Sequence, residues 1–468
     1  GYSDTETLVA LFDTYGVQKT LNKLIGMFAI SIWDCEEKSL YLARDRIGEK
    51  PLYYGEQNNI KFFSSELKSI LAHPEFIPDI NRDALSLFMQ HGYVPHPYSI
   101  FNNISKLRPG CFVNLSNFST PISYWSLSNA ISQNCLEKQN WQSNKDILYN
   151  VEANLANVVG SQMQSDVPIG SFLSGGVDST LITSMMQQHS SSPIKTYSIG
   201  FEDENFNEAP YARAIAKQIG TCHFEHYVSE NQLMDVVPKL SHIYDEPFAD
   251  SSQIPTFLIS QIASKELSVA LTGDGGDELF GGYNRYTWGA SIWSKTKFLP
   301  SNIRMLISYL LKLAKPQKID QAVSPMFNLL PKSLVYSKVG MKVSKIASIL
   351  ASDSDLGVYR NLVSTWSNPT DIVLNSADID IFSNKLERYE GSGDLKMVMM
   401  YLDMLTYLPD DILVKVDRAA MGVSLETRVP FLDKRIVELA MHIPIDMKIR
   451  NGIGKWCLRK ILYGRVPK

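Results

Sequence analysis

The sequence has 468 residues, which is enough for two or three domains of about 150 residues each. Hydrophobic residues make up 44% and charged residues 20% of the chain, as in ordinary globular proteins, which excludes a collagenous or intrinsically disordered protein. The net charge of -4 gives no overall attraction for nucleic acid or anionic lipid, so we expect neither as a partner.

The five cysteines lie far apart and form no CxxC pair, which argues against a zinc or dithiol site and favours a reducing cytoplasm. No apolar run approaches the roughly 20 residues that are needed to cross a bilayer. The N-terminus shows no charged and apolar pattern of a signal peptide. We therefore expect a cytoplasmic protein without a membrane segment.

The N-terminal part predicts a helix followed by an antiparallel sheet. Residues 3–6, SDTE, have the pattern of a capping box and precede apolar residues at helical spacing. Short β-rich stretches separated by turns then follow at Met27–Trp33, Leu40–Ala43, Pro51–Tyr54, Ile60–Ser64 and Cys111–Leu115. The polar sequence after them predicts a domain boundary, which gives domains at 1–125 and 146–468 and a linker at 126–145.

From Asp146 onward, strands alternate with helices, which predicts a parallel sheet covered by helices. The predicted helices include Val177–Gln188 and Asn207–Ile219, the latter with Asn207 as N-cap and Gly220 past its end. Residues 287–403 read as mostly helical and carry no motif that we can interpret. The predicted strands are Pro168–Leu173, Ile194–Phe201, Cys222–Val228 and Leu267–Leu271.

The first chemical motif lies where an apolar strand ends and a helix begins. It reads SGGVDS, with Ser174, Gly175 and Gly176 followed by Asp178 and Ser179. Adjacent glycines let backbone amides face an anion and the helix N-terminus adds partial positive charge, so the loop fits a phosphate chain. Asp178 would repel bare phosphate and makes sense as a ligand of Mg²⁺ that bridges the phosphates. The alternative is a Gly/Ser turn whose aspartate starts a helix.

A second motif, TGDGGDE, directly follows another apolar strand. Its acids Asp274, Asp277 and Glu278 repel one another unless a cation or a substrate ammonium compensates them. The carboxyl ends of parallel strands are where open α/β sheets bind ligands, so Asp277 could meet Asp178 across one Mg²⁺. A solvated acidic turn is the alternative interpretation.

Together the two loops resemble the glutamine-dependent asparagine synthetases of the bacterial type, and SGGxDS resembles the pyrophosphate-binding loop of the N-type ATP pyrophosphatases. The resemblance covers nearly the whole chain and implies an α/β fold. It implies a remnant of an antiparallel αββα amidotransferase domain of the Ntn-hydrolase type, then a doubly wound parallel sheet with a helical C-terminal part. Further matching segments are ARDRIG at 43–48, FSSELK at 63–68, DEPFADSS at 245–252, LVKVDR at 413–418 and ETRVPFLD at 426–433.

This resemblance also implies the reaction, which is ATP-dependent formation of asparagine from aspartate through β-aspartyl-AMP, with ammonia supplied from glutamine. The implied cofactors are ATP and Mg²⁺. The implied partners are small substrates, namely aspartate, ATP and glutamine or ammonia. A homodimer is compatible with the family. Relatives of this architecture amidate sugar acids or close β-lactam or peptide rings. We expect residues 249–255 to help select the acceptor.

Residue by residue, the resemblance places two groups around ATP. Asp178 and Asp277 would be the metal-linked carboxylates, and Asp274 falls at the acid implicated in forming the acyl-adenylate, where many relatives carry Glu. Core packing is the alternative for two of the adenine and ribose positions, Phe172 and Ile199. The phosphate group comprises Ser174, Gly175, Gly176, Asp178 and Ser179, and the adenine and ribose group comprises Phe172, Ile199, Thr272 and Gly273.

Two further matches lie near the ends of the chain. Lys455 corresponds to the lysine that stabilises charge developing during adenylation and amide formation. Without the resemblance, a solvated surface lysine would be the simpler interpretation. Asp4 corresponds to the aspartate that holds the α-ammonium of glutamine, and it is also a favourable first-turn acid of a helix. For Arg44 and Arg46 we expect a structural ion pair and no catalytic role.

The nucleophile of the hydrolase half is missing, because the family uses an N-terminal cysteine whose own α-amino group is the base. Gly1 is not that residue and none of the five cysteines is terminal. We therefore expect a fragment that begins inside the hydrolase domain and stops within a segment that continues in the family. An inactive nucleotide-binding module is a further alternative, but the loop glycines and acids and Lys455 are intact. A sulfur-transfer or tRNA-modifying relative would need a reactive cysteine pair or a basic stripe.

Overall fold

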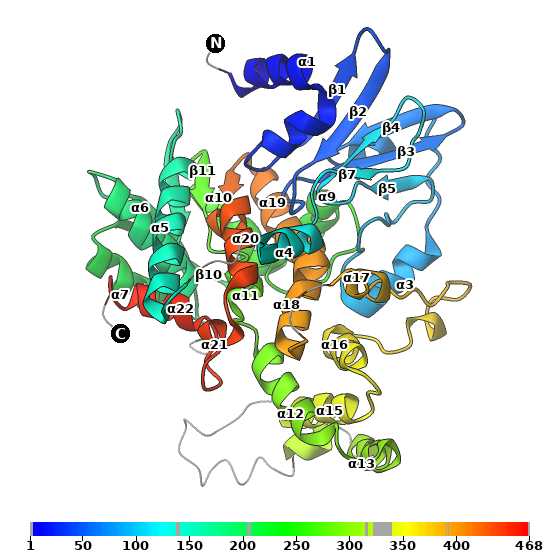
Figure 1. Cartoon of the computed structure of the whole chain (residues 1–468), viewed down its shortest axis with the longest axis vertical. Coiled ribbons are helices and arrows are strands. Elements are labelled where there is room, and N and C mark those ends of the chain that lie inside the picture. The colour runs from blue at the N-terminus through cyan, green and yellow to red at the C-terminus, as the bar shows by residue number, and fades with distance from the viewer. Residues whose placement is uncertain are drawn as a thin grey trace.

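The N-terminal lobe, blue and cyan in Figure 1, is built from antiparallel strands as its sequence predicts. Helix α1 (Asp4–Lys23) precedes the strands, and the Oγ of Ser3 accepts a hydrogen bond from the amide of Thr5 at 3.2 Å, so Ser3 is the predicted cap. Two sheets form, in the orders β1-β2-β6-β7 and β4-β3-β5. The remaining elements of this lobe are β1 (Ala29–Asp34), β2 (Ser39–Arg44), β3 (Tyr53–Gln57), β4 (Ile60–Ser64), α2 (Leu67–Leu71), α3 (Arg82–His91), β5 (Ile104–Lys106), β6 (Cys111–Asn114) and β7 (Ile122–Ser123).

This computed structural model describes residues 3–136, 141–203, 207–313, 317–321, 339–389, 391 and 393–466. Within those ranges, no helix combines the length and the apolar character that a membrane span requires.

A five-stranded, fully parallel sheet forms the centre of the second lobe, in the order β10-β9-β8-β11-β12. Four of its strands match the predicted ones within two residues. The fifth, β12, is a charged three-residue strand that the sequence analysis did not identify as a strand. The strands are β8 (Ile169–Phe172), β9 (Lys195–Phe201), β10 (Cys222–Val228), β11 (Val269–Leu271) and β12 (Glu426–Arg428).

Helices cover both faces of this sheet because each strand alternates its side chains between them. On β11, Val269 and Leu271 join the core that includes α5 (Asn144–Gln162) and α6 (Val177–His189). Ala270 points to the other face and joins a cluster with α10 (Gln253–Ala263) and α19 (Leu413–Met421). The predicted doubly wound architecture is thus confirmed.

Helix α7 (Ala209–Ile219) differs from its prediction at the first turn. Its N-cap is Glu208, whereas the predicted cap, Asn207, lies one residue earlier and accepts a hydrogen bond from the amide of Ala209 at 3.2 Å. The proline in the first turn lacks a backbone N–H, so a cap has less to satisfy there. Gly220 ends the helix with φ +85°, as predicted.

The predicted linker at 126–145 contains a helix, α4 (Leu127–Leu136). Leu127, Ala130 and Ile131 are buried, and this i, i+3, i+4 spacing gives the helix an apolar face in an otherwise polar stretch. The helix packs against α20 (Lys434–His442). Where one domain ends and the next begins stays a prediction.

The rest of the chain is mostly helical, and residues 287–403 are helical wherever regular structure is described, as expected. One buried carboxylate organises this region: Asp403 accepts hydrogen bonds from Arg285, Tyr286 and Tyr359. The helices are α8 (Glu230–Met234), η1 (Val237–Lys239), α9 (Leu240–Tyr244), α11 (Gly276–Phe280), η2 (Arg285–Gly289), α12 (Ala290–Thr296), α13 (Ser301–Leu313), α15 (Val339–Leu350), α16 (Asp355–Val363), η4 (Pro369–Asp371), α17 (Ser383–Leu386), α18 (Leu395–Leu405), η5 (Leu408–Ile412), η6 (Pro430–Leu432), α21 (Ile445–Lys448) and α22 (Trp456–Leu462).

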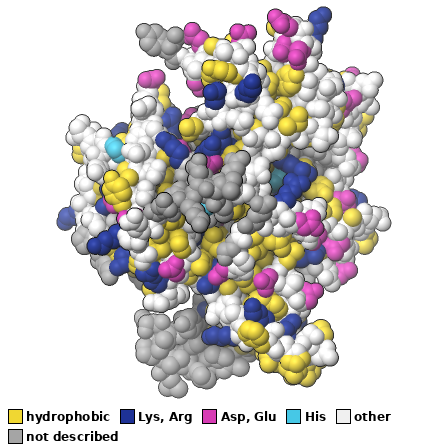
Figure 2. Space-filling model, viewed as in Figure 1, with side chains coloured by type: hydrophobic (Ala, Val, Ile, Leu, Met, Phe, Trp, Pro, Cys, Tyr) yellow, Lys and Arg dark blue, Asp and Glu magenta, His cyan; other side chains and the backbone are white. Residues whose placement is uncertain are grey.

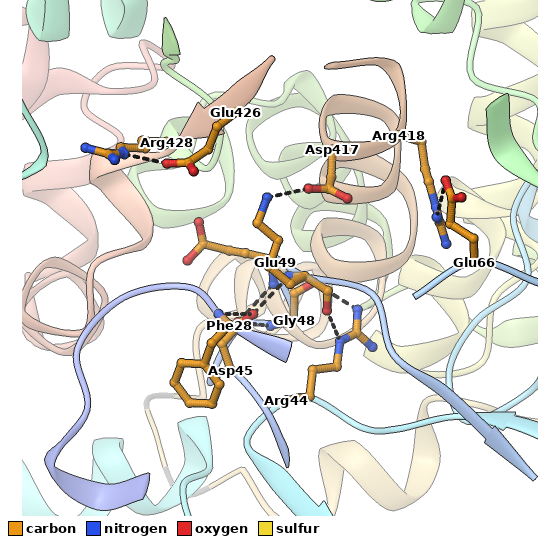
Figure 3. Close-up of polar contacts among 11 residues, drawn as sticks. Phe28, Arg44, Asp45, Gly48, Glu49, Glu66, Asp417, Arg418, Glu426 and Arg428 are labelled. Carbon is orange, nitrogen blue, oxygen red and sulfur yellow. Dashed lines mark hydrogen bonds and ion pairs between the residues drawn. The ribbon is translucent and has the colours of Figure 1, made fainter. Parts of the chain in front are cut away.

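The segment ARDRIG folds as a turn held by Asp45, whose carboxylate accepts hydrogen bonds from the amides of Gly48 at 2.7 Å and Glu49 at 2.9 Å (Figure 3). Arg44 and Arg46 do not form the ion pair that we expected. Their guanidinium groups donate to backbone carbonyls, including that of Gly48 for Arg44 and that of Leu24 for Arg46. The two arginines therefore have a structural role, in which they bind backbone carbonyl oxygens and not carboxylates.

Polar contacts from this turn join the two lobes. Lys50 Nζ lies 2.6 Å from Asp417 on α19, and the neighbouring Arg418 pairs with Glu66 at 3.3 Å (Figure 3). Arg418 also donates to the backbone carbonyl of Ser65 at 2.6 Å. One face of α19 thus contacts the N-terminal lobe.

Candidate active site at the carboxyl ends of strands β8 and β11

The SGGVDS loop connects β8 to α6 in a tight turn. Gly175 has φ +84°, and a Cβ there would lie 3.1 Å from the Cβ of Tyr211 on α7, so a larger residue would be strained and crowded. The Oγ atoms of Ser174 and Ser179 are 3.0 Å apart, and the amide of Gly176 donates to Ser174 at 3.2 Å. The loop is therefore pre-shaped by its own hydroxyl groups.

The TGDGGDE loop, between β11 and α11, packs directly onto the first loop. A Cβ on Gly273 would lie 2.6 Å from the amide nitrogen of Ser179, and a Cβ on Gly276 would lie 2.6 Å from the carboxyl carbon of Asp178. Real Cβ atoms do not approach so closely, so both positions require glycine. The two motifs predicted to meet at the sheet edge do meet there.

Lys455 joins the acids of the two loops. Its Nζ forms ion pairs with Asp178 and with Asp277, the latter at 2.6 Å. Burial alone would lower the pKa of Lys455, but the two carboxylates outweigh burial and raise it, so the ammonium is fixed in its charged form. Burial raises the pKa of Asp178 to about 6, against the opposing effect of Lys455. Lys455 is thus half-buried in the site, not a solvated surface lysine.

A cavity of about 490 Å³ opens beside these groups. Phe172 and Ile199, for which core packing was the alternative, are half-buried residues that both line this cavity and contact the apolar clusters behind it. Of the residues predicted around ATP, Gly175 is not among the lining residues. Those that line the cavity are Phe172, Ser174, Gly176, Asp178, Ser179, Ile199, Thr272, Gly273, Asp274, Asp277 and Lys455.

A second cavity of about 510 Å³ adjoins the first and shares Asp274 and Lys415 with it. Lys415 pairs with Asp250 at 3.0 Å. Burial would lower the pKa of Lys415, but Asp250 and Asp274 together raise it. Asp411 lines the same cavity, where burial and the charge of Asp250 raise its pKa well above the usual range. One ammonium and several carboxyl groups therefore face the space next to the nucleotide-sized cavity.

Glu278 also lines this second cavity. Burial raises its pKa to about 7, although the hydroxyl of Tyr283, which donates to it at 2.6 Å, acts in the opposite direction. Sequence reasoning assigned no role to Lys415, Asp411 or Glu278. Lys415 lies in LVKVDR, one of the segments that match the family, and Asp411 lies two residues before it. This match was the only feature of the sequence that pointed to these two residues.

Asp4 lies elsewhere, at the first turn of α1 in the N-terminal lobe. It is exposed, and its carboxylate accepts a hydrogen bond from the amide of Thr5 at 2.7 Å. This geometry is that of a helix-start acid, and a role toward glutamine stays a prediction.

The acids of the site fit a divalent cation that is bound with phosphate. Asp178 Oδ1 is buried and has no hydrogen-bond partner, which leaves one carboxylate oxygen free beside the Asp277 carboxylate. Across the described parts of the chain, no group of three His, Cys, Asp or Glu side chains is arranged to hold a metal by itself. Mg²⁺ commonly takes one or two carboxylates and completes its shell with phosphate oxygens and water.

The comparisons with known proteins agree with this architecture. Residues 150–468 match the asparagine synthase family, and residues 1–125 match the glutamine amidotransferase domain family. The chain is 32% identical to asparagine synthetase [glutamine-hydrolyzing] 1 of Bacillus subtilis, over 100% of this chain and 69% of that protein.

Two other relatives span a similar share. Asparagine synthetase [glutamine-hydrolyzing] 3 of B. subtilis is 29% identical over 99% of this chain and 69% of its own length. Amidase chry2 of Gibberella zeae is 25% identical over 96% and 68%. The chain, with its two lobes and its paired loops, belongs to the asparagine synthase family and carries an N-terminal glutamine amidotransferase domain.

Proposed function

We propose that this protein forms asparagine from aspartate at the expense of ATP, through β-aspartyl-AMP, with ammonia derived from glutamine. The observation that carries the proposal is the contact of Lys455 with both Asp178 and Asp277 at the meeting point of two glycine loops. Such a site has a fixed cation and two carboxylates beside a glycine loop at a helix N-terminus, which suits a nucleoside triphosphate that is cleaved between its α and β phosphates.

At the nucleotide end, the hydroxyl groups of Ser174 and Ser179 and the amides of the glycine loop would bind the pyrophosphate. Phe172, Ile199, Thr272 and Gly273 would contact the adenine and the ribose. Asp178 and Asp277 would hold Mg²⁺, which when bound neutralises phosphate charge and orients the leaving pyrophosphate.

Lys455 would stabilise the negative charge that develops on the α-phosphate oxygens during adenylation and on the carbonyl oxygen during amide formation. A lysine already fixed by two carboxylates needs no reorganisation when the reaction starts, which is the condition for electrostatic catalysis. Asp274 lies between the two cavities and would act near the acyl-adenylate, although its side chain is one methylene shorter than the Glu of many relatives.

At the acceptor end, the second cavity suits an amino acid. Lys415 would bind its α-carboxylate, and Asp250 and Asp411 would bind its α-ammonium. Aspartate carries these two groups and presents a second carboxylate toward the nucleotide cavity. Of these three groups, only Asp250 lies within residues 249–255, the segment that we expected to help select the acceptor.

The supply of ammonia from glutamine by the N-terminal lobe is a separate proposal. Asp4 would hold the glutamine α-ammonium, and ammonia would pass to the synthetase cavity. A homodimer, which rests on the family resemblance, and a cytoplasmic location, which rests on the dispersed cysteines, are likewise proposals.

The test measures pyrophosphate release with Mg·ATP and ammonium chloride while aspartate is compared with glutamate, succinate and a sugar acid. We expect release with aspartate together with asparagine, and no release with succinate, which lacks the ammonium that Asp250 and Asp411 would bind. Release with a sugar acid in place of aspartate would keep the adenylating chemistry and overturn the acceptor. A folded protein that binds ATP and releases no pyrophosphate with any acid would overturn the proposed reaction.

The matched variant is Lys415→Met, which keeps the length of the side chain and removes its charge. We expect the KM for aspartate to rise by about tenfold or more while the affinity for ATP stays close to the wild-type value, because the lost contact is with the acceptor. An unchanged KM for aspartate would contradict the assignment of Lys415.

A further inference from the structure

A third cavity, of about 450 Å³, opens between the N-terminal lobe and the helices α17 and α18. It shares no lining residue with either cavity of the active site. Figure 2 shows Lys and Arg side chains gathered in a hollow that lies, in Figure 1, between β5 and α17. The cavity is therefore separate from the proposed reaction and is strongly basic.

Three cations line it from two different lobes. Arg108 comes from the segment after β5, whereas Lys385 and Arg388 come from α17 and the turn that follows it. Within the described ranges of the chain, no carboxylate pairs with any of the three and no hydrogen bond engages the charged end of their side chains. Cations that converge without counter-charges repel one another; Lys385 is half-buried, whereas Arg108 and Arg388 are exposed and water screens their charge.

The two acids near the cavity, Asp410 and Asp380, accept hydrogen bonds from other groups, although Oδ1 of Asp410 is buried without a hydrogen-bond partner. Asp410 lies 2.6 Å from the Nδ1 of His96 and also accepts a hydrogen bond from the amide of that residue at 2.9 Å. Asp380 accepts hydrogen bonds from the amide of Phe382 at 2.8 Å and from the hydroxyl of Ser383 at 2.6 Å. Neither acid forms an ion pair with the three cations.

Arg46, the fourth cation of the lining, differs from the other three because its guanidinium donates to backbone carbonyls at the end of α1. Burial, with a smaller effect from the charge of Arg108, lowers the pKa of Lys385 to about 8, and Asp410 opposes this change only in part. An anion placed beside Lys385 would reverse the shift. The unsatisfied charge is thus concentrated on Arg108, Lys385 and Arg388.

We propose that this cavity binds a small anion that carries two or more negative charges, such as a phosphate compound or a polycarboxylate. Guanidinium groups bind the oxygen pairs of phosphates and carboxylates in a bidentate manner, and a lysine adds a point charge. Apolar side chains such as Tyr401 and Met404 line the same space and would contact a compact non-polar part of the ligand. Because Arg108 and Lys385 belong to different lobes, the bound anion would also hold the lobes together.

The test is isothermal titration calorimetry of the full chain with inorganic pyrophosphate and, separately, with citrate, in the absence of magnesium. Pyrophosphate can also enter the active site, so Lys455→Gln is measured in parallel to remove that contribution. We expect binding to persist in Lys455→Gln, to weaken by about tenfold or more in Lys385→Gln, and to be unchanged in Lys312→Gln, an exposed lysine on α13. We also expect the ligand to raise the thermal midpoint of the wild type but not that of Lys385→Gln.

The two probes distinguish the source of the anion. Binding of pyrophosphate alone assigns the cavity to phosphate compounds, binding of citrate alone assigns it to polycarboxylates, and binding of both shows that charge decides. If Lys385→Gln fails to fold, Arg388→Gln serves instead, because the Arg388 side chain is exposed. The proposal is overturned if neither probe binds Lys455→Gln, or if the charge-removing variants of this cavity bind both probes as tightly as Lys312→Gln does.

Discussion

At the scale of single residues, the site depends on charges that are held in fixed positions. Lys455 has φ +55°, a backbone region that is uncommon for residues other than glycine, and it follows Gly454, whose Cβ would lie 2.2 Å from the carbonyl oxygen of Gly281. The chain thus accepts a strained conformation to bring the ammonium between two carboxylates. The sequence could identify Lys455 only through the resemblance, because an isolated lysine carries no local signal.

Asp178→Asn tests the charge without changing the volume. We expect pyrophosphate release to fall by about 100-fold, because the variant removes both the proposed metal ligand and one partner of Lys455. The circular dichroism spectrum and the thermal midpoint should stay near their wild-type values. Wild-type release by this variant would contradict the metal assignment.

At the scale of elements, the alternation of strands and helices was predictable because buried parallel strands are apolar and their helices have clear ends. The strand β12 escaped prediction because its three residues, Glu426–Arg428, are mostly charged and are ordered by pairing with β11. Helix α4 escaped because its apolar residues are interspersed with Ser, Asn and Gln, although Leu127, Ala130 and Ile131 have helical spacing. Contacts with the rest of the fold, and not the local sequence, therefore determine the secondary structure of both β12 and α4.

The close packing of the two loops gives a prediction with an internal control. Gly276→Ala would place a Cβ 2.6 Å from the carboxyl carbon of Asp178, so we expect at least a tenfold loss of pyrophosphate release as that carboxylate is displaced. Gly393→Ala is the control, because a Cβ there meets nothing within 4 Å. Equal activity of the two variants would show that the loops tolerate separation.

At the scale of the whole molecule, the acceptor cavity could not be predicted because its groups come from distant segments. Asp250 precedes α10, Asp274 follows β11 and Lys415 lies on α19, so the three meet only after the sheet and α19 have packed. The two glycine loops were predictable because each is contiguous and each follows a strand. Acceptor recognition was not, because no short segment contains it.

Buried histidines predict how the stability of the fold depends on pH. Burial lowers the pKa of His91 to about 3, and burial lowers that of His96 to about 4 although Asp410 opposes it. Below the ordinary value of 6.5 the unfolded chain takes up protons that the folded chain refuses, so stability falls as pH falls from 6.5 to about 4. Each histidine contributes about 1.4 kcal/mol per pH unit within its window.

The measurement is the urea midpoint between pH 7 and pH 4.5 in the wild type and in His91→Phe. His91 packs edge-on against Phe382, with the ring centroids 5.5 Å apart, so phenylalanine fits the site while removing the titration. We expect a shallower pH dependence for His91→Phe and an unchanged one for His226→Phe, whose side chain is exposed. Identical slopes in all three proteins would contradict the assignment.

The nine residues of α19 contact both lobes of the molecule. Lys415 faces the acceptor cavity, whereas Asp417 and Arg418, less than one turn away, contact Lys50 and Glu66 of the amidotransferase lobe. A short helix moves as a rigid body, so a displacement of the amidotransferase lobe by a fraction of an ångström would carry the Lys415 ammonium with it. The site that would deliver ammonia and the site that would consume it are thereby mechanically connected through a single helix.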